Sequence, residues 1–268
     1  MISARAYSDS EEKLGALFPI HGKKLVISTK NNRLRMKKGF SGKDLDESLF
    51  KSCRQIYIDI YQFHNPAFCP RPEDGTGLYE AALKAKEQGK IRHIGITNHR
   101  LAVADEAIAS GLYETLQFPF SYLAAEADIK LAEQCKDADM GFIAMKGLSG
   151  GLIHNSAAAY AFMAQPQFSN VAPIWGIQKE NELDEFLSYE VCPPQLTKEL
   201  QEEIAKDREQ LSGDFCRGCG YCMPCPAGIE INNCARMSLM LRRAPQTAWL
   251  SSEWQAKMQK IDGCMHCK

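Results

Sequence analysis

The arrangement of apolar segments constrains the fold of this chain more than any other feature. Short apolar runs of strand length alternate with longer amphipathic segments of helical length over most of the chain. The expected strands are residues 24–30, 55–63, 90–97, 115–120, 140–145 and 171–176. Because strands that are separated by helices pair in parallel, this pattern predicts an α/β protein with one parallel sheet.

Helices are expected between these strands. Their predicted ranges are residues 8–18, 39–54, 75–88, 101–110, 125–137, 156–165 and 182–189. Part of a further strand precedes Tyr7. A closed barrel of alternating strands and helices needs eight strands. The predicted fold class is therefore a (β/α)8 TIM-type barrel that lacks its first strand or strands.

A run of cysteines near the end of the chain is the second informative feature. Cys216, Cys219, Cys222 and Cys225 recur at every third position, and Pro226 follows the last of them. Thiolates at this spacing can converge on one soft metal centre, and the terminal Cys-Pro is typical of iron–sulfur ligation. A zinc site more often uses two distant Cys-x2-Cys pairs, but zinc and uncoordinated thiols stay open as alternatives.

A change in composition divides the chain into three parts. Seven of the eleven cysteines lie after residue 215, and Pro193-Pro194 interrupts the earlier pattern. We predict a barrel in residues 1–192, a linker helix in 193–212 and a small α-helical, ferredoxin-like iron–sulfur domain in 213–268. In this last part, residues 231–243 are expected to be helical. One further helix face is expected to carry Leu250, Trp254, Met258 and Ile261.

Charge and hydropathy exclude several classes of partner. The 268 residues carry a formal net charge of −1, which predicts no nucleic-acid or anionic-membrane partner. No apolar run approaches the ~18 residues of a membrane span, and the first residues lack the pattern of a signal peptide. Eleven cysteines without an export signal predict a reducing, cytoplasmic location, where thiols stay available as ligands.

Polar side chains stand at the expected strand ends, where parallel barrels carry their chemistry. Tyr7 follows the partial strand, Lys30 ends the next, and His64 follows the strand after that. A phenol, with a pKa of about 10, is a weak acid near neutral pH, but a nearby ammonium lowers that pKa. An imidazole beside it could hold a carbonyl oxygen. Together the three groups suit proton transfer to a carbonyl.

Several stretches resemble the aldo/keto reductase family, in the family's order. Residues 4–15, ARAYSDSEEKLG, are similar to its active-site tyrosine region. Residues 28–30, 62–65 and 94–98 are similar to later landmarks, and residues 216–226 resemble the ferredoxin-type extension of one bacterial branch. The resemblance implies a (β/α)8 barrel that uses NADPH or NADH to reduce a small-molecule carbonyl, or to catalyse the reverse reaction. A redox partner protein for the iron–sulfur part is left open.

The resemblance also implies roles for individual residues. Tyr7 matches the general acid, Lys30 the residue that tunes it, and His64 the group that orients the carbonyl. Asn98 and Gln117 match contacts to the nicotinamide carboxamide. Gly147, Gly150 and Gly151 match the loop beside the pyrophosphate. Lys179 and Asn181 match the region near the adenosine phosphate. Because Lys179 and Asn181 have acidic neighbours, the start of a solvated helix is an equally good interpretation of these two residues.

The chain departs from the family pattern in three places. Ile2 stands where the family has an aspartate that pairs with the lysine, and the first strand and helix have no counterpart. The second cysteine motif ends at Cys267, whereas two-cluster ferredoxins continue with more cysteines. One 4Fe-4S cluster is therefore expected, held by Cys216, Cys219 and Cys222 with Cys225 or a later cysteine such as Cys234 or Cys267. A chain that is part of a longer protein would show the same departures.

Three functions compete at this point. The first is an NAD(P)H-dependent oxidoreductase of the aldo/keto reductase type, coupled to a 4Fe-4S cluster. The second is an electron-transfer or redox-sensing iron–sulfur protein on a degenerate, non-catalytic barrel. Retention of Tyr7, Lys30 and His64 favours the first, and Ile2 with the missing strand favours the second. A zinc-stapled interaction module is a third, weaker alternative.

Overall fold

The computed structural model describes residues 2–4, 9–21, 26–31, 57–177, 179–211, 216, 222–243 and 246–267. Tyr7, Cys219 and the helix expected at residues 39–54 lie outside these ranges. The strands are β1 Ser28–Asn31, β2 Ile58–His64, β3 Ile91–Thr97, β4 Thr115–Pro119, β5 Gly141–Met145 and β6 Val171–Pro173. The helices are α1 Ser10–His21, α3 Leu78–Glu87, α4 Leu101–Ser110, α5 Glu126–Asp137, α6 Ser156–Met163, α7 Glu180–Val191, α8 Lys198–Leu211, α9 Ile231–Cys234, α10 Met237–Arg243, α11 Gln246–Trp249 and α12 Ser252–Gln259. Two 3₁₀ turns, η4 Pro166–Phe168 and η5 Lys260–Gly263, complete the set.

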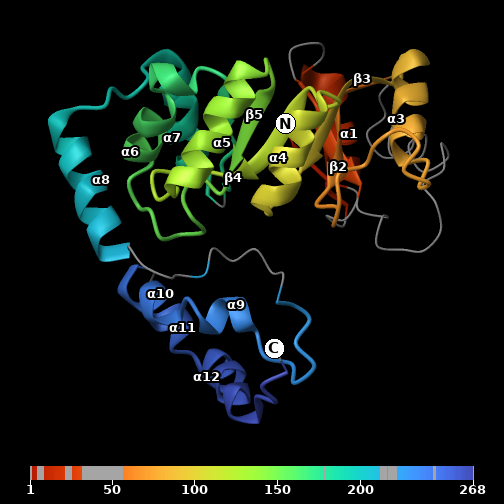
Figure 1. Cartoon of the computed structure of the whole chain (residues 1–268). Helices are drawn as coiled ribbons and strands as arrows, with labels where there is room; N and C mark the ends of the chain where they lie inside the picture. The colour runs from red at the N-terminus through yellow and green to blue at the C-terminus, as the bar shows by residue number, and fades with distance from the viewer. Residues whose placement is uncertain are drawn as a thin grey trace. The chain divides into compact units, whose positions relative to one another are not determined.

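The six strands form one parallel sheet in the order β1-β2-β3-β4-β5-β6, so each strand pairs with its neighbour in sequence (Figure 1). This confirms the predicted parallel α/β sheet. The partial strand before Tyr7 is represented by an isolated parallel bridge between Ile2 and Ser28. A backbone hydrogen bond of 2.8 Å from the Ser3 N–H to the Ser28 carbonyl oxygen supports it. Residues 2 and 3 therefore pair beside β1.

Buried apolar side chains hold the helices against the sheet. Ile58, Phe63 and Ile96 are almost fully buried on the strands, and Ala82 and Ala104 are fully buried on α3 and α4. Small side chains at these helix positions let the helix backbones come close to the strands. In Figure 1, α4 and α5 lie side by side against the strands. β5, with the sequence GFIAM, is a near-continuous apolar run, as expected for a strand in a sheet covered by helices, whereas β1, with the sequence STKN, is polar throughout.

A close approach between β3 and β4 requires a glycine. A Cβ atom added to Gly95 would lie 2.2 Å from the Thr115 Oγ1 atom, far inside contact distance. Thr115 is the residue that pairs with Gly95 across the two strands. We infer that Gly95 is needed to admit the threonine hydroxyl to the face of the sheet that carries the polar side chains.

The described structure divides into two compact units. The first comprises residues 1–119, 125–145 and 167–174, and the second residues 120–124, 146–166 and 175–268. The first unit holds the whole sheet, with α1, α3, α4 and α5. The second holds α6 to α12 and the connections that follow β4 and β5. The predicted segments 1–192, 193–212 and 213–268 stay a prediction.

Long-range contacts fix α8 within the second unit. The Tyr122 hydroxyl donates to the Asp207 carboxylate at 2.6 Å, and the Arg208 Nε donates to the Tyr122 carbonyl oxygen at 2.6 Å. Both Tyr122 and Asp207 are buried. A small apolar cluster lies in the same unit and comprises Leu152, Leu211, Leu239 and Met240. The predicted linker helix is thus a packed helix of this unit.

One predicted helix is interrupted. Residues 231–243 form two short helices, α9 and α10, with Ala235 and Arg236 between them. The break leaves Arg236 at the start of α10, where its carbonyl oxygen accepts the N–H groups of Leu239 and Met240. Apolar periodicity alone does not distinguish one continuous helix from two that follow one another.

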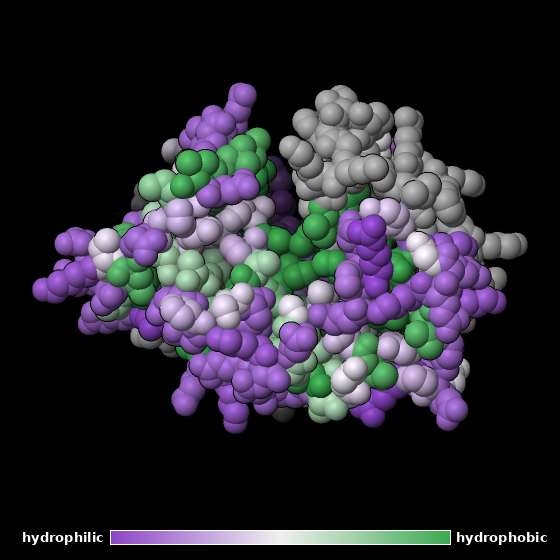
Figure 2. Space-filling view, turned by 90° about the horizontal axis from the view of Figure 1, so that it is seen from above, coloured by the Kyte–Doolittle hydropathy of each residue, from purple (hydrophilic) through white to green (hydrophobic). Residues whose placement is uncertain are grey.

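Hydrophilic side chains cover much of the face that Figure 2 shows, with hydrophobic ones between them. This distribution fits a chain in which 24% of the residues are charged. In the described part of the chain, every helix is too short or too polar to span a lipid bilayer.

Candidate functional site

The carboxyl ends of β1, β2 and β3 bring three of the polar side chains to one face of the sheet. Lys30 pairs with Gln62, and His64 pairs with Thr97. Side chains alternate between the two faces along a strand, so His64 points to the same face as Gln62 and Lys30. An ammonium, an imidazole and a hydroxyl therefore stand on adjoining strand ends, where parallel α/β proteins bind ligands.

A buried polar layer extends across the same face. The Gln62 Nε2 donates to the Ser28 Oγ at 2.7 Å and to the Gln117 Oε1 at 3.1 Å. All three residues are almost completely buried. Among the described residues, the Gln62 Oε1 and the Thr115 Oγ1 have no hydrogen-bond partner. Gln117 thus belongs to an amide network inside the sheet, one strand away from Thr97 and two strands away from His64.

Lys30 is buried to an extent that is unusual for a lysine, with only 4% of its surface exposed. Burial lowers the pKa of its ammonium from 10.5 to about 8. Ile2 lies opposite Ser28, two residues before Lys30, and so faces the same side of the sheet. The position at which the family has its aspartate is thus near Lys30, and here it carries a hydrocarbon side chain.

The lowered pKa of Lys30 predicts a pH-dependent stability. Between about pH 8 and pH 10.5 the unfolded chain holds a proton on Lys30 that the folded chain has released, so stability should rise with pH across this window. The gain is on the order of 3 kcal/mol, since each pKa unit corresponds to about 1.4 kcal/mol. Urea unfolding of the wild type and of Lys30→Met at several pH values measures it. Only the wild type should gain this unfolding free energy between about pH 8 and pH 10.5. If the free energy of unfolding changes with pH in the same way for both proteins, the lowered pKa of Lys30 is wrong.

The loop after β2 is fixed directly behind His64. Asn65 adopts a left-handed backbone with φ of 52°, which asparagine tolerates better than most residues, and its N–H donates to the Thr97 carbonyl oxygen at 2.8 Å. The Asn98 Nδ2 donates to the Pro66 carbonyl oxygen at 2.9 Å. The Asn98 Oδ1 accepts the backbone N–H groups of His99 and Arg100. Asn98 therefore ties together the loops that follow β2 and β3.

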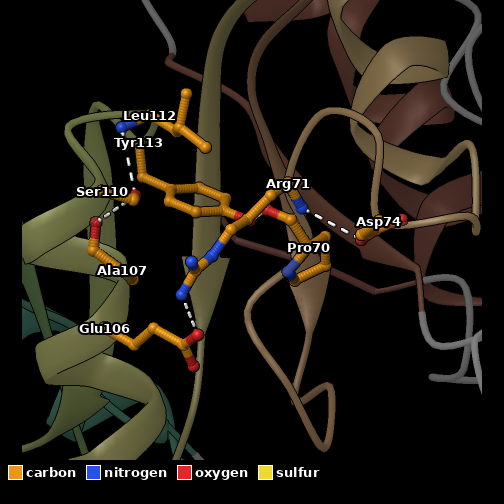
Figure 3. Close-up of polar contacts among 8 residues, drawn as sticks. All are labelled: Pro70, Arg71, Asp74, Glu106, Ala107, Ser110, Leu112 and Tyr113. Atoms are coloured by element: carbon orange, nitrogen blue, oxygen red, sulfur yellow. Dashed lines mark hydrogen bonds and ion pairs between the residues drawn. The ribbon is translucent and has the colours of Figure 1, made fainter.

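A second anchor holds the same loop further along (Figure 3). The Tyr113 hydroxyl donates to the Pro70 carbonyl oxygen, and Arg71 forms an ion pair with Glu106 of α4. Burial raises the pKa of Tyr113, so its hydroxyl stays a neutral donor. Burial also raises the pKa of the Cys69 thiol, which disfavours the reactive thiolate. We interpret this group as support for the His64 loop.

In the second unit, the glycines of residues 147–151 form a tight turn. Ser149, Gly150 and Gly151 have φ values of 49°, 66° and 90°, and the Ser149 Oγ lies 2.9 Å from the Ser121 Oγ. Gly147 packs so close to Trp175 that an added Cβ would lie 2.9 Å from the indole ring. The predicted pyrophosphate loop is therefore a strained turn that needs its glycines.

The two residues predicted near the adenosine phosphate are exposed. Lys179 precedes α7, and its backbone N–H donates to the Glu182 carboxylate at 3.2 Å. Asn181 lies in the first turn of α7 between Glu180 and Glu182. Both the phosphate contact and the solvated helix start fit this position, so the phosphate contact stays a prediction.

Sequence reasoning missed one residue beside the predicted pyrophosphate loop. The Arg236 Nη2 donates to the carbonyl oxygens of Ser149 at 2.8 Å and of Gly150 at 3.2 Å. Arg236 lies 87 positions from Ser149. No local pattern could have indicated this contact.

Among the described cysteines of the last segment, five are free thiols: Cys222, Cys225, Cys234, Cys264 and Cys267. Cys216 and Cys225 are partly buried, and Cys222 is exposed. Within the described ranges, no three cysteine, histidine, aspartate or glutamate side chains lie in an arrangement that could hold a metal ion. Cys219, in the middle of the run, lies outside those ranges. The cluster ligands therefore stay a prediction.

Known proteins resemble the part of the chain that carries the strand-end residues. The sequence model of the aldo/keto reductase family matches residues 3–170. The aldo-keto reductase YhdN of Bacillus subtilis is 27% identical over 163 residues, which cover 56% of this chain and 47% of that protein. The chain thus spans about half the length of this curated relative.

Solved structures agree on the fold. An aldo-keto reductase from Bacillus halodurans, in its holo form, aligns with a TM-score of 0.60 and 17% identity, over 77% of this chain and 81% of that one. A thermostable aldo-keto reductase solved with the inhibitor epalrestat aligns with a TM-score of 0.56 and 19% identity over the same shares. The family match extends over more than half of the chain and includes β1 to β5 with Lys30 and His64. The chain therefore belongs to the aldo/keto reductase family.

Proposed function

We propose that this protein is an NAD(P)H-dependent oxidoreductase that interconverts a small-molecule carbonyl compound and its alcohol. One observation carries the proposal. Lys30 and His64 stand on adjoining strand ends of one face, and Lys30 is buried there with a pKa of about 8. A buried ionisable group with a perturbed pKa is unusual outside functional sites. Reduced nicotinamide, when bound, supplies the hydride that converts the carbonyl carbon to an alcohol.

Three residues share the proton chemistry. Tyr7 is the proposed general acid, which gives its proton to the carbonyl oxygen as the alcohol forms. With a pKa of about 8, Lys30 is mostly cationic near neutral pH, and a cation near the phenol lowers the pKa of that phenol. His64 is the proposed donor that orients the carbonyl oxygen. The anchored loop behind His64 supports this role, because a positioned donor must be held rigidly.

The proposed cofactor contacts form two separate groups of residues. In the first unit, Asn98 and Gln117 present buried amides suited to a carboxamide. In the second, Gly147, Gly150 and Gly151 form a turn suited to phosphate groups, because backbone close to a ligand requires residues without a side chain. Lys179 and Asn181 are the proposed contacts near the adenosine phosphate.

We also propose that the last segment is a ferredoxin-type extension that holds one 4Fe-4S cluster. The donor set fits, because Cys222 and Cys225 of the run are free thiols and thiolates are the usual ligands of iron–sulfur clusters. Cys216, Cys219 and Cys222 would hold it with Cys225 or a later cysteine. Such a cluster supplies one-electron transfer, for which a redox partner protein is the proposed recipient or source.

Binding of the reduced nucleotide tests the oxidoreductase proposal most directly. NADPH or NADH should bind the purified full chain with a change in nucleotide fluorescence. Asn98→Ala should weaken binding by about 1–3 kcal/mol, because a buried carboxamide loses its partner. Titration with each nucleotide, followed by fluorescence, measures the effect.

Asn170→Ala is the matched control, because Asn98 also has a structural role. The Asn170 Nδ2 donates to the carbonyl oxygens of Ala132 and Met140, so its loss disturbs a loop in a comparable way. Only Asn98→Ala should change the affinity for the nucleotide, with folding of both variants checked by circular dichroism. If well-folded wild-type protein binds neither nucleotide at millimolar concentration, the electron-transfer alternative takes the place of this proposal.

A further inference from the structure

An arginine from the cysteine-rich segment, Arg236, is hydrogen-bonded to the strained turn at residues 149–151. One nitrogen of the guanidinium, the Arg236 Nη2, donates to the carbonyl oxygens of both Ser149 and Gly150. Both contact partners belong to the second compact unit. A charged donor shared by two consecutive peptide groups forms stronger hydrogen bonds than a neutral one.

The backbone of this turn needs such a partner. Ser149 has a φ of 49°, and a non-glycine residue in the left-handed region persists only where its surroundings hold it. Peptide groups are planar and trans, so each carbonyl oxygen and the N–H of the next residue point in opposite directions. By fixing the carbonyl oxygens of Ser149 and Gly150, Arg236 therefore fixes the direction of the N–H groups of Gly150 and Gly151. The Gly151 N–H already donates to the Leu148 carbonyl oxygen at 3.0 Å, so the Gly150 N–H is the donor that a phosphate group would use.

Packing around the turn shows that the contact is tight. A Cβ atom on Gly150 would lie 3.0 Å from the Arg236 guanidinium, and one on Gly151 would lie 3.7 Å from the Met240 side chain. Leu152, which follows the turn, is fully buried in a cluster with Leu239 and Met240 of α10. Arg236 and α10 therefore form one side of the turn.

We propose that Arg236 is a positioning residue for the pyrophosphate loop, so that the affinity for the dinucleotide depends on the cysteine-rich segment. This inference rests on the proposed oxidoreductase function and adds a residue to its cofactor site. Arg236 acts through the peptide groups of Ser149 and Gly150 and needs no contact with the nucleotide itself.

Two variants and a matched control test this role in the full chain. Arg236→Met keeps an unbranched apolar side chain and removes all the donors, whereas Arg236→Lys keeps a cationic donor. Arg242→Met is the control, because Arg242 lies on the same α10 helix, is exposed, and donates to the Ser238 carbonyl oxygen of its own helix. The probes are NADPH and ADP-ribose, which has the pyrophosphate but no nicotinamide.

Calorimetric titration should show that Arg236→Met weakens both probes about tenfold, equivalent to about 1.4 kcal/mol. Arg236→Lys should recover part of the loss, and Arg242→Met should bind both probes as the wild type does. Asn98→Ala should weaken NADPH and leave ADP-ribose unchanged, which separates the nicotinamide contacts from the loop. Unchanged ADP-ribose binding in folded Arg236→Met would overturn the inference and leave the proposed function standing. Wild-type protein that binds neither probe would overturn both.

A second measurement does not depend on the nucleotide. Hydrogen exchange followed by mass spectrometry should show faster exchange at residues 149–153 in Arg236→Met, and no change there in Arg242→Met. A merely destabilised protein would exchange faster throughout. Equal exchange of the turn in the wild type and in Arg236→Met would show that the arginine does not hold it.

Discussion

Tyr7→Phe should reduce the rate of carbonyl reduction by about 10²–10⁴, the typical contribution of a positioned general acid. The substitution keeps the ring and removes only the hydroxyl, so packing should hardly change. Reduction of a panel of simple aldehydes, followed by the absorbance of NADPH, measures the rate. Tyr57→Phe is a matched control, because its ring packs under Arg92 and that contact needs no hydroxyl. The control should keep the full rate.

Substitutions at Lys30 and Ile2 test the same mechanism in a second way. Lys30→Met should also slow the reaction, because without the ammonium the pKa of the phenol returns upward. Ile2→Asp should place a carboxylate on the face that carries Lys30, given the pairing of Ile2 with Ser28. That carboxylate would favour the ammonium and raise its pKa above about 8, which should shift the pH window of stability upward and raise turnover. If Tyr7→Phe leaves turnover unchanged while Ile2→Asp unfolds the protein, the tyrosine-centred mechanism is wrong.

The second large effect concerns the cysteine run. Anaerobically purified protein should be brown and should contain iron with acid-labile sulfide. Cys219→Ser should lose most of that iron, because a hydroxyl is a harder and less acidic ligand than a thiol. Iron and sulfide analysis, together with the visible absorption spectrum, measures the loss.

Cys192→Ser is the control for this experiment. Cys192 is an exposed free thiol outside the run, so its replacement should leave the iron content unchanged. Cys225→Ser, Cys234→Ser and Cys267→Ser, compared in the same way, would identify which of these is the fourth ligand. Colourless protein that contains stoichiometric zinc would show that the metal is zinc and that the segment is a structural module.

The sequence by itself determined the sheet. Alternating apolar runs and helical segments predicted six strands in parallel, and the strands lie within a few residues of the predicted ranges. This success has a simple cause, because periodicity of two or of 3.6 residues reports local backbone structure. The resemblance to the family likewise rested on short motifs whose order survives along the chain. The same locality explains why the break within residues 231–243 was missed, since a two-residue interruption hardly alters the periodicity.

Only the tertiary structure decided the environment of those residues. Gln62 and Gln117 share a hydrogen bond across 55 positions, Tyr122 and Asp207 across 85, and Arg236 and Ser149 across 87. The burial that lowers the pKa of Lys30 to about 8 likewise belongs to the folded sheet, in which Lys30 pairs with Gln62, 32 positions away. Such contacts depend on how the chain is packed in space, and a local pattern carries no record of which distant side chain will arrive. The sequence therefore identified Lys30 and the glycine loop as candidates. Packing in the folded protein lowered the pKa of Lys30 and brought Arg236 into hydrogen-bond contact with the glycine loop.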